Sequence, residues 1–313
     1  ISERAATLRW AGLVLRGKSP VDESWTVAEL IAAQPAAARD LLWSPLCVAA
    51  LNTPAESASA TVFVEVLRRS FNGSTENSSL VVPRADLTEL LPAPALREVA
   101  TLGGELCLGA PVESVSRAGP AGASVRVAGV ERRFDAAIIA TGPQHVARLL
   151  PWDTSGLATN LASLRYEPIS TLHFEFAYVF PGVDPAVPML MLDGDPGQWL
   201  FWHRLPNGHQ RASVVISAHH REEPEAAITA ATLAQLQRSY QLPAPIWQRL
   251  ITEKRATYAC TPVQRRLLQA LPAQIGCIYF AGDWCVPELP ATLESAVLSG
   301  ERAAARLQGD FDA

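Results

Sequence analysis

The chain has 313 residues, of which 49% are hydrophobic and 18% charged, a composition typical of packed domains and not of disordered chains. A net charge of −5 at pH 7, with no cluster of Lys or Arg, argues against a nucleic-acid partner. Five scattered cysteines and six histidines without ligand spacing predict neither a disulfide framework nor a metal site. They favour a reducing, cytoplasmic compartment.

The first 80 residues are expected to be mainly helical. Apolar residues recur at helical spacing in WTVAELIAAQ and PAAARDLLWSPLCVAAL, and Asn-Thr-Pro at 52–54 marks a stop between helices. A polar loop, a helix, a Gly-Gly turn and a hairpin are predicted next. They precede RRFDAAIIATGP, a short apolar run typical of a central strand in an α/β sheet.

The middle of the chain reads as an antiparallel sheet. STLHFEFAYVF alternates strictly, so that His173 and Glu175 lie on one face and five large apolar residues on the other. The apolar set is Leu172, Phe174, Phe176, Tyr178 and Phe180. QWLFWHRL and RASVVISAHH flank a Pro-Asn-Gly-His turn and predict a hairpin, and PEAAITAATLAQLQRSY predicts a helix.

These elements predict a mixed fold, α/β with α+β character, made of two interleaved domains. One domain is expected to use residues 81–150 and 250–313, and the other residues 1–80 and 151–249.

The segment IYFAGDWCVPELPATLESAVLSGERAAARL, residues 278–307, carries the strongest chemical signal. A buried-type strand ends at Gly282, where a turn is easy without a Cβ, and Asp283 follows at the carboxyl end of the strand, where open α/β sheets bind ligands. Pro290 suits the first turn of the next helix, whose free N–H groups favour an electron-rich partner. Those N–H groups belong to Ala291, Thr292 and Leu293. A plain strand–turn–helix with a capped end explains the pattern equally well.

This segment resembles the C-terminal flavin motif of the FAD-dependent amine oxidase and phytoene desaturase superfamily. The resemblance implies that Asp283, next to Gly282, holds the ribityl–phosphate part of FAD. It also implies that the backbone of residues 291–293 faces the flavin pyrimidine. The strand containing Val112 matches the one whose backbone contacts the adenine.

Three other segments narrow the resemblance. Residues 41–71, 82–115 and 253–262 are similar to the squalene-associated FAD-dependent desaturases of hopanoid-producing bacteria, which are hydroxysqualene dehydroxylases. The superfamily's phosphate-binding GxGxxG, however, has no match in the sequence. We therefore expect an incomplete FAD-binding Rossmann-like domain interleaved with a substrate domain of antiparallel sheet and helices. Either the chain is a fragment, or the complementary segment lies on another chain.

The resemblance implies reductive removal of the hydroxyl group of hydroxysqualene to give squalene. His173, Glu175 and His203 are the candidate proton donors, and each has an ordinary structural explanation as well. The aromatic face of residues 172–180 would line an apolar tunnel, or it would form ordinary core, which is the commoner use. An isoprenoid lipid substrate implies peripheral contact with the inner face of the membrane, through residues 10–15 or 90–94.

Two alternatives stay open at this point. One is a carotenoid-type desaturase, which shares the cofactor and the apolar tunnel. The other is a non-catalytic fragment that lacks the nucleotide-binding half. The oligomeric state is not predicted.

Overall fold

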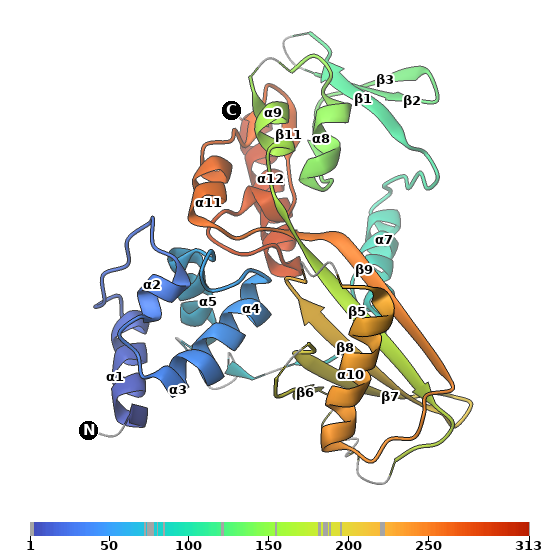
Figure 1. Cartoon of the computed structure of the whole chain (residues 1–313). Helices are drawn as coiled ribbons and strands as arrows, with labels where there is room; N and C mark the ends of the chain where they lie inside the picture. Colours follow the sequence, from blue (N-terminus) through green and yellow to red (C-terminus); the bar gives the residue numbers. More distant parts are fainter. Residues whose placement is uncertain are drawn as a thin grey trace. The chain divides into compact units, whose positions relative to one another are not determined.

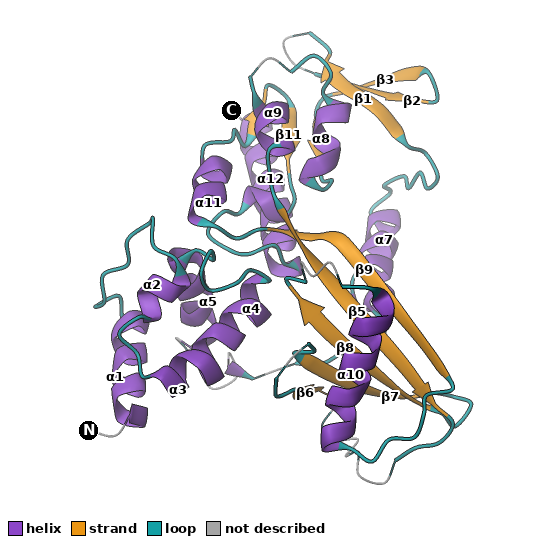
Figure 2. Ribbon diagram, viewed as in Figure 1, coloured by secondary structure: helices purple, strands orange, loops and turns teal. Residues whose placement is uncertain are grey.

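The computed structural model describes residues 3–312 apart from 72, 74–77, 80, 84, 120–121, 154, 181–182, 184–186, 188, 195 and 220–222. The chain forms two compact units. Unit 1 comprises Ile1–Arg68, Leu164–Gln269 and Pro287–Ala291, and unit 2 comprises Arg69–Ser163, Ala270–Val286 and Thr292–Ala313. Helices and strands are mixed in both units, as the sequence predicted (Figure 2).

Unit 1 begins with a cluster of short helices. They are α1 (Glu3–Leu15), α2 (Val27–Ile31), α3 (Ala36–Ala38), the π-helical turn η1 (Arg39–Trp43), α4 (Ser44–Leu51) and α5 (Ala60–Phe71). Their apolar sides form one core that includes Val14, Cys47 and Phe63, all fully buried. Asn52 ends α4 in the left-handed region, with φ 46°. The side-chain N–H of Asn52 donates to Thr257 Oγ1 at 2.9 Å, and its side-chain oxygen Oδ1 accepts from the Ala218 N–H at 2.7 Å. These two bonds connect the helices to the sheet of this unit.

The rest of unit 1 is a five-stranded antiparallel sheet in the order β6-β7-β8-β5-β9. The strands are β5 (Tyr166–Phe176), β6 (Met189–Met191), β7 (Trp199–Arg204), β8 (Gln210–Ser217) and β9 (Trp247–Tyr258). Helix α10 (Glu225–Ser239) lies across one face (Figure 1), where Ile228 and Leu236 join the buried side chains of the strands. Helix α11 (Pro262–Gln269) follows β9. The sheet therefore has one covered face and a second face that α10 does not touch.

Unit 2 contains two small sheets. The first is a meander of β1 (Val112–Arg117), β2 (Ala123–Val127) and β3 (Val130–Phe134), and the second has the order β10-β11-β4. In the second sheet β4 (Ala137–Ile139) and β11 (Ile278–Phe280) are parallel, and β10 (Gln274–Ile275) is antiparallel to β11. The helices are α6 (Leu87–Leu90), α7 (Pro92–Thr101), α8 (Pro143–Leu149), α9 (Leu157–Ala162) and α12 (Leu293–Asp312), with a 3-10 turn η3 (Asp283–Cys285) before α12. Helix α12 packs on β11 through Ala303 and Leu307.

The sequence analysis placed domain boundaries near residues 80, 150 and 250, whereas the compact units change over after Arg68, Ser163 and Gln269. The short segment Pro287–Ala291 also belongs to unit 1. Strand β9 accounts for the last difference. It pairs with β5 from Tyr166 to Glu175, so its residues belong with the antiparallel sheet of unit 1. In the described part of the chain, no helix combines the length and the apolar character that crossing a bilayer requires.

Candidate functional site

The predicted Gly-Asp turn lies in unit 2, directly after β11. Gly282 has φ 141°, a conformation that only glycine adopts readily, and a Cβ there would lie 2.6 Å from Trp284 Nε1. The Trp284 indole N–H donates to the Thr141 carbonyl at 3.1 Å, and the Gly282 N–H donates to Ser299 Oγ at 2.7 Å. The turn is therefore held from two sides, by the end of β4 and by α12, and it presents Asp283 at the carboxyl ends of the parallel strands.

Asp283 is a mostly buried carboxyl group. Its Oδ1 accepts the Trp284 N–H at 2.9 Å, and no salt bridge to it is found among the described residues. Burial raises the pKa of Asp283 above its usual range, and the backbone hydrogen bond from Trp284 offsets only part of this effect. The group thus has unused hydrogen-bonding capacity, which hydroxyl groups of a bound sugar alcohol would satisfy.

Helix α12 begins at Leu293, three residues after Pro290, which the sequence analysis had placed in the first turn of this helix. Thr292 occupies the N-cap position because its Oγ1 accepts the Ser295 N–H at 3.3 Å and its own N–H donates to Ser295 Oγ at 3.0 Å. Of the three predicted donors, Ala291 precedes the helix and the Thr292 N–H is used by the cap. Within the described ranges, the N–H groups of Leu293 and Glu294 donate to no acceptor. The turn containing Asp283 packs against this helix.

Val112 lies at the start of β1, where the pairing with β2 is irregular. It borders an apolar recess of about 340 Å³ in unit 2. The recess is lined by Val115, Val125, residues 137–141, His145, Arg148 and Leu149. Val112, Gly282, Asp283 and Leu293 are thus all parts of unit 2, the unit in which the flavin-binding elements were expected.

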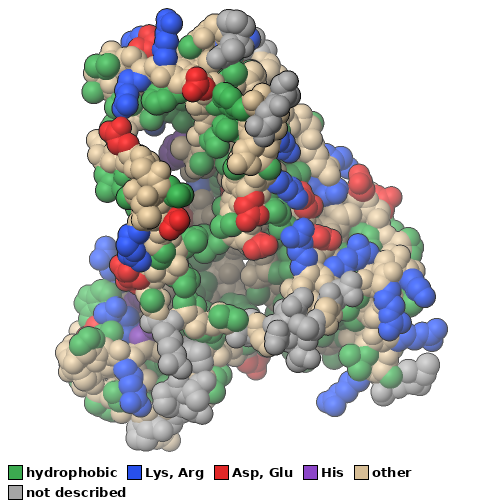
Figure 3. Space-filling model, turned by 180° about the vertical axis from the view of Figure 1, so that it is seen from behind, with side chains coloured by type: hydrophobic (Ala, Val, Ile, Leu, Met, Phe, Trp, Pro, Cys, Tyr) green, Lys and Arg blue, Asp and Glu red, His purple; other side chains and the backbone are tan. Residues whose placement is uncertain are grey.

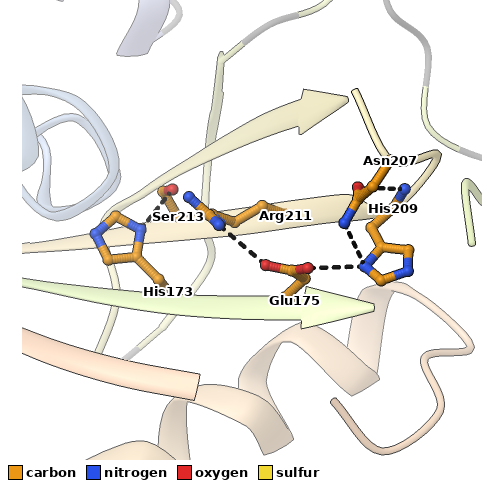
Figure 4. A network of polar contacts seen from close by, with 6 residues as sticks. All are labelled: His173, Glu175, Asn207, His209, Arg211 and Ser213. Carbon is orange, nitrogen blue, oxygen red and sulfur yellow. Dashed lines mark hydrogen bonds and ion pairs between the residues drawn. The ribbon is translucent and has the colours of Figure 1, made fainter. Parts of the chain in front are cut away.

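The candidate proton donors lie together in unit 1, on the sheet face that α10 does not cover. Figure 4 shows two of them, His173 and Glu175, with their polar neighbours. Strand pairing places His173 opposite Ser213, and Arg211 between Glu175 and His203. His173 Nδ1 lies 2.9 Å from Ser213 Oγ. The Glu175 carboxylate accepts from Arg211 Nη2 at 2.9 Å, and its other oxygen lies 2.7 Å from His209 Nδ1.

The three candidate proton donors differ in their protonation states, because the charges around them differ. The hydrogen bonds from His209 and then Arg211 lower the pKa of Glu175, so it is a carboxylate at neutral pH. Burial, followed by the positive charge of Arg211, lowers the pKa of His173 and of His203, so both imidazoles are neutral near pH 7. Glu175 therefore forms an ion pair with Arg211. The neutral imidazoles of His173 and His203 can each donate one hydrogen bond.

The aromatic face forms the core, which is the commoner of the two uses expected from the sequence. Leu172, Phe174 and Phe176 are 0% exposed and pack beneath α10. The alternation ends with β5 at Phe176, and Tyr178 beyond it is 52% exposed. The part of this face on β5 is therefore packed core beneath α10.

The sequence analysis missed the apolar residues of the opposite face. Phe201 pairs with Ser213 and Trp199 with Val215, and both aromatic side chains are only half-buried. Met189 and Met191 continue the same face on β6, and Met191 is 57% exposed. Trp199 and Phe201 lie in the apolar run QWLFWHRL, which the sequence analysis had interpreted only as a strand of a hairpin. It assigned side chains to the two faces of the sheet only in β5, where polar and apolar residues alternate strictly. The face with His173 thus combines an apolar region and a polar one.

Comparison with known proteins gives the family. Residues 19–308 match the family described as "Flavin containing amine oxidoreductase". The hydroxysqualene dehydroxylase of Rhodopseudomonas palustris is 31% identical over 274 residues, which cover 85% of this chain and 61% of that protein. The enzyme of the same name from Sinorhizobium fredii is 30% identical over 275 residues, which cover 83% of this chain and 60% of that protein. The chain therefore spans about three-fifths of the length of these curated relatives.

Solved structures share the fold. A putrescine oxidase variant redesigned for cofactor binding superimposes with a TM-score of 0.70 at 17% identity, covering 98% of this chain and 76% of the other. Cyclohexylamine oxidase from Brevibacterium oxydans superimposes with a TM-score of 0.69 at 14% identity, covering 99% of this chain and 75% of the other. With a family match over nearly its whole length and two relatives at or above 30% identity, this chain belongs to the flavin containing amine oxidoreductase family.

Proposed function

We propose that this protein is a FAD-dependent oxidoreductase that removes the hydroxyl group of hydroxysqualene to give squalene, the substrate class that the name of its curated relatives indicates. The observation that carries the flavin part of the proposal is the packing of the Asp283 turn against α12 within unit 2, where the Gly282 N–H donates to Ser299 Oγ. Unit 2 thus contains a partly buried carboxyl group in the turn after β11 and two open backbone N–H groups, those of Leu293 and Glu294, at the start of the helix that this turn contacts.

These residues fit a flavin. Asp283 would accept hydrogen bonds from the sugar-alcohol chain, because its partly buried carboxyl has only the backbone N–H groups of Trp284 and of Asp283 itself as donors among the described residues. The N–H groups at the α12 start would face the oxygen-rich side of the ring, where a helix N-terminus stabilises negative charge by about 0.3–1 kcal/mol at exposed sites. Val112 would present its backbone to the adenine. Reduced flavin supplies a hydride, and the protein has to bind the lipid, exclude water and protonate the leaving oxygen.

The face of the unit 1 sheet that α10 does not cover suits the lipid. Phe201, Trp199 and the two methionines of β6 offer an apolar surface, and aromatic faces stabilise an allylic cation. Beside them His173 is anchored through Nδ1 by Ser213. When the ring is protonated, Ser213 Oγ can accept from Nδ1, and the imidazolium can give its Nε2 proton to a leaving hydroxyl and become a neutral imidazole. We therefore assign the proton-donor role to His173 rather than to Glu175, which Arg211 and His209 hold as a carboxylate.

Peripheral contact with the cytoplasmic face of a membrane forms part of the proposal. On the face shown in Figure 3, Lys and Arg side chains gather over the N-terminal helices of unit 1. Helix α1 has the exposed cations Arg4 and Arg9 beside Leu8, which is 73% exposed. An exposed apolar side chain among cations suits an anionic lipid surface. Cosedimentation with anionic and neutral vesicles tests this contact, and equal or absent binding to both would contradict it.

The reaction is tested by product analysis. The chain is incubated with hydroxysqualene and chemically reduced FAD, and squalene is measured by gas chromatography and mass spectrometry. In a parallel reaction it is incubated with phytoene and oxidised FAD, because desaturation needs an electron acceptor. Squalene formation supports the proposal. Conversion of phytoene instead would support a carotenoid-type desaturase, and bound FAD without turnover of either lipid would support a non-catalytic role.

A further inference from the structure

On the face of the unit 1 sheet that α10 does not cover, side chains of all five strands line up in a row. From β6 to β9 the row consists of Met191, Trp199, Val215, Thr171 and Ile251, each paired across strands with the next. Because neighbouring strands lie about 4.8 Å apart, the row is about 19 Å long. All its members except Thr171 are apolar, and the side chains at both ends are open to solvent, with Met191 57% and Ile251 49% exposed. We call this set the apolar row.

The apolar row has polar neighbours on both sides. The next row along the strands consists of Met189, Phe201, Ser213, His173 and Arg249. It is apolar on β6 and β7 and polar on the other three strands. On the other side of the apolar row, Ile169 lies between Ser217 and Glu253. An apolar strip this narrow suits an elongated hydrocarbon chain lying across the strands, whereas a broad ring system would cover charged groups.

Thr171 is the polar member of the apolar row, and its hydroxyl group has no hydrogen-bond partner among the described residues. Its cross-strand neighbours Val215 and Ile251 carry only hydrocarbon side chains. His173, whose Nδ1 contacts Ser213 Oγ, follows two residues later on the same face of β5. The Cα atoms of two such residues lie about 7 Å apart in a strand. A single oxygen atom above β5 can therefore lie within hydrogen-bonding distance of both Thr171 and His173.

We propose that the apolar row binds the isoprenoid chain across the strands and that Thr171 Oγ1 holds the hydroxyl group of the substrate beside His173. The identity of the lipid rests on the proposed function, whereas the row and the position of Thr171 follow from the strand register. Thr171 can accept a hydrogen bond from the substrate hydroxyl, which leaves the lone pairs of the substrate oxygen free for the proton of His173. Thr171 is therefore a substrate-binding residue that distinguishes an oxygenated chain from a hydrocarbon.

The same contact favours release of the product. A hydrocarbon chain on the apolar row covers Thr171 Oγ1 and gives it no partner, and a covered hydroxyl group without a hydrogen bond costs free energy. Squalene, which lacks the hydroxyl group, should therefore bind more weakly than hydroxysqualene, although both chains make the same apolar contacts. We expect the two Kd values to differ by about fivefold or more.

Binding is measured without FAD, so that the test does not depend on turnover. The distribution of hydroxysqualene and of squalene between detergent micelles and the chain gives the Kd of each lipid. Thr171→Val removes the hydroxyl group, keeps a β-branched side chain and should bind both lipids with the same Kd, whereas Thr171→Ser should keep the preference of the wild type. Thr159→Val, at an exposed position of α9 in unit 2, is the control. Equal Kd values for the wild type, or a preference that survives in Thr171→Val, would overturn the role of Thr171.

A charge at either end of the apolar row tests the course of the chain across the strands. Met191→Lys on β6 and Ile251→Lys on β9 change exposed side chains, so the unfolding temperatures should stay near that of the wild type. Each variant should weaken the binding of both lipids by about tenfold, because the chain would have to cover a charged group. Val130→Lys, at a position of β3 that is 62% exposed, is the control. Unchanged binding by either end variant would overturn the placement of the chain on the apolar row.

Turnover with reduced FAD separates this inference from the proposed function. A preference for hydroxysqualene that depends on Thr171, without formation of squalene, would leave the binding mode intact and count against the proposed reaction. Squalene formation with an unchanged KM in Thr171→Val and Ile251→Lys would do the reverse.

Discussion

The indole N–H of Trp284 donates to the carbonyl oxygen of Thr141 at 3.1 Å. This side-chain bond connects the segments that follow the parallel strands β4 and β11, beyond the last backbone hydrogen bond between the two strands. The ring can reach Thr141 only because it lies against Gly282, which has no Cβ. The position of Asp283 in the candidate flavin site depends on this contact, since Asp283 stands between the glycine and the indole.

Gly282→Ala is expected to destabilise the chain by about 2 kcal/mol, because the new methyl group would meet Trp284 Nε1 at 2.6 Å in a backbone conformation that alanine resists. Urea unfolding measures the change. Gly300→Ala in α12 is the control, since nothing lies within 4 Å of the added Cβ. It should be neutral or stabilising, by up to about 1 kcal/mol. Equal effects of the two substitutions would contradict this account.

Asp283→Asn should stabilise the chain at neutral pH and weaken flavin binding. Burial raises the pKa of Asp283, so the native state pays a penalty for the charged form. That penalty is absent below the ordinary pKa of 3.8 and grows as pH rises from there to the folded pKa. The unfolding temperatures of variant and wild type should therefore agree near pH 3 and differ at pH 7. A less stable variant at pH 7 would show that the carboxylate has a stabilising partner.

Glu175→Gln should show the opposite pH dependence. The folded pKa of Glu175 lies below its ordinary value of 4.5, so the carboxylate contributes stability that is fully present above pH 4.5 and is lost as pH falls through the folded pKa. Thermal unfolding between pH 2.5 and 7 checks this. The variant should be less stable than wild type at pH 7 and equal to it at the acidic end. A difference that does not depend on pH would mean that the Arg211 and His209 contacts do not favour the ionised form.

His173→Gln should lower kcat by about a hundredfold with little change in KM, if His173 gives a proton to the leaving oxygen. Because burial lowers the pKa of His173, wild-type kcat should rise as pH falls below 6.5, and the variant should lose this dependence. Ser213→Ala, which frees His173 Nδ1, should have a smaller effect of the same kind. Arg133→Gln, at an exposed position of β3 in unit 2, is the control. A His173 variant with an unchanged pH profile would remove the residue from the mechanism.

FAD added to the chain alone should raise the unfolding temperature by no more than about 2 °C, because weak binding shifts the folding equilibrium little. The reason is the absence of a GxGxxG match, which leaves the diphosphate without its backbone cradle. Differential scanning fluorimetry with and without FAD measures the shift. A much larger shift would show that Asp283 and the α12 start suffice for tight binding.

Local patterns of the sequence were enough to predict the Gly-Asp turn after a buried strand, the hairpin of β7 and β8, and the opposite faces of β5. Each of these features depends on residues close together in the chain: a glycine that allows the turn at 282, Asn-Gly between two apolar runs, and the two-residue period of a strand. The family resemblance added the flavin, and the family match bears it out.

The tertiary structure determined which face of β5 is buried, where α12 begins and which residue pairs with Glu175. Alternation in β5 cannot tell which face is buried; the packing of α10 against Phe174 made the aromatic face core and left the His173 face for polar contacts. The start of α12 moved to Leu293 because two hydroxyl groups, Thr292 and Ser295, satisfy each other's backbone N–H. Glu175 became an ion-pair partner because strand register brought Arg211 opposite it. Pairings between residues far apart in the chain have no local signature, so only the folded chain settles them.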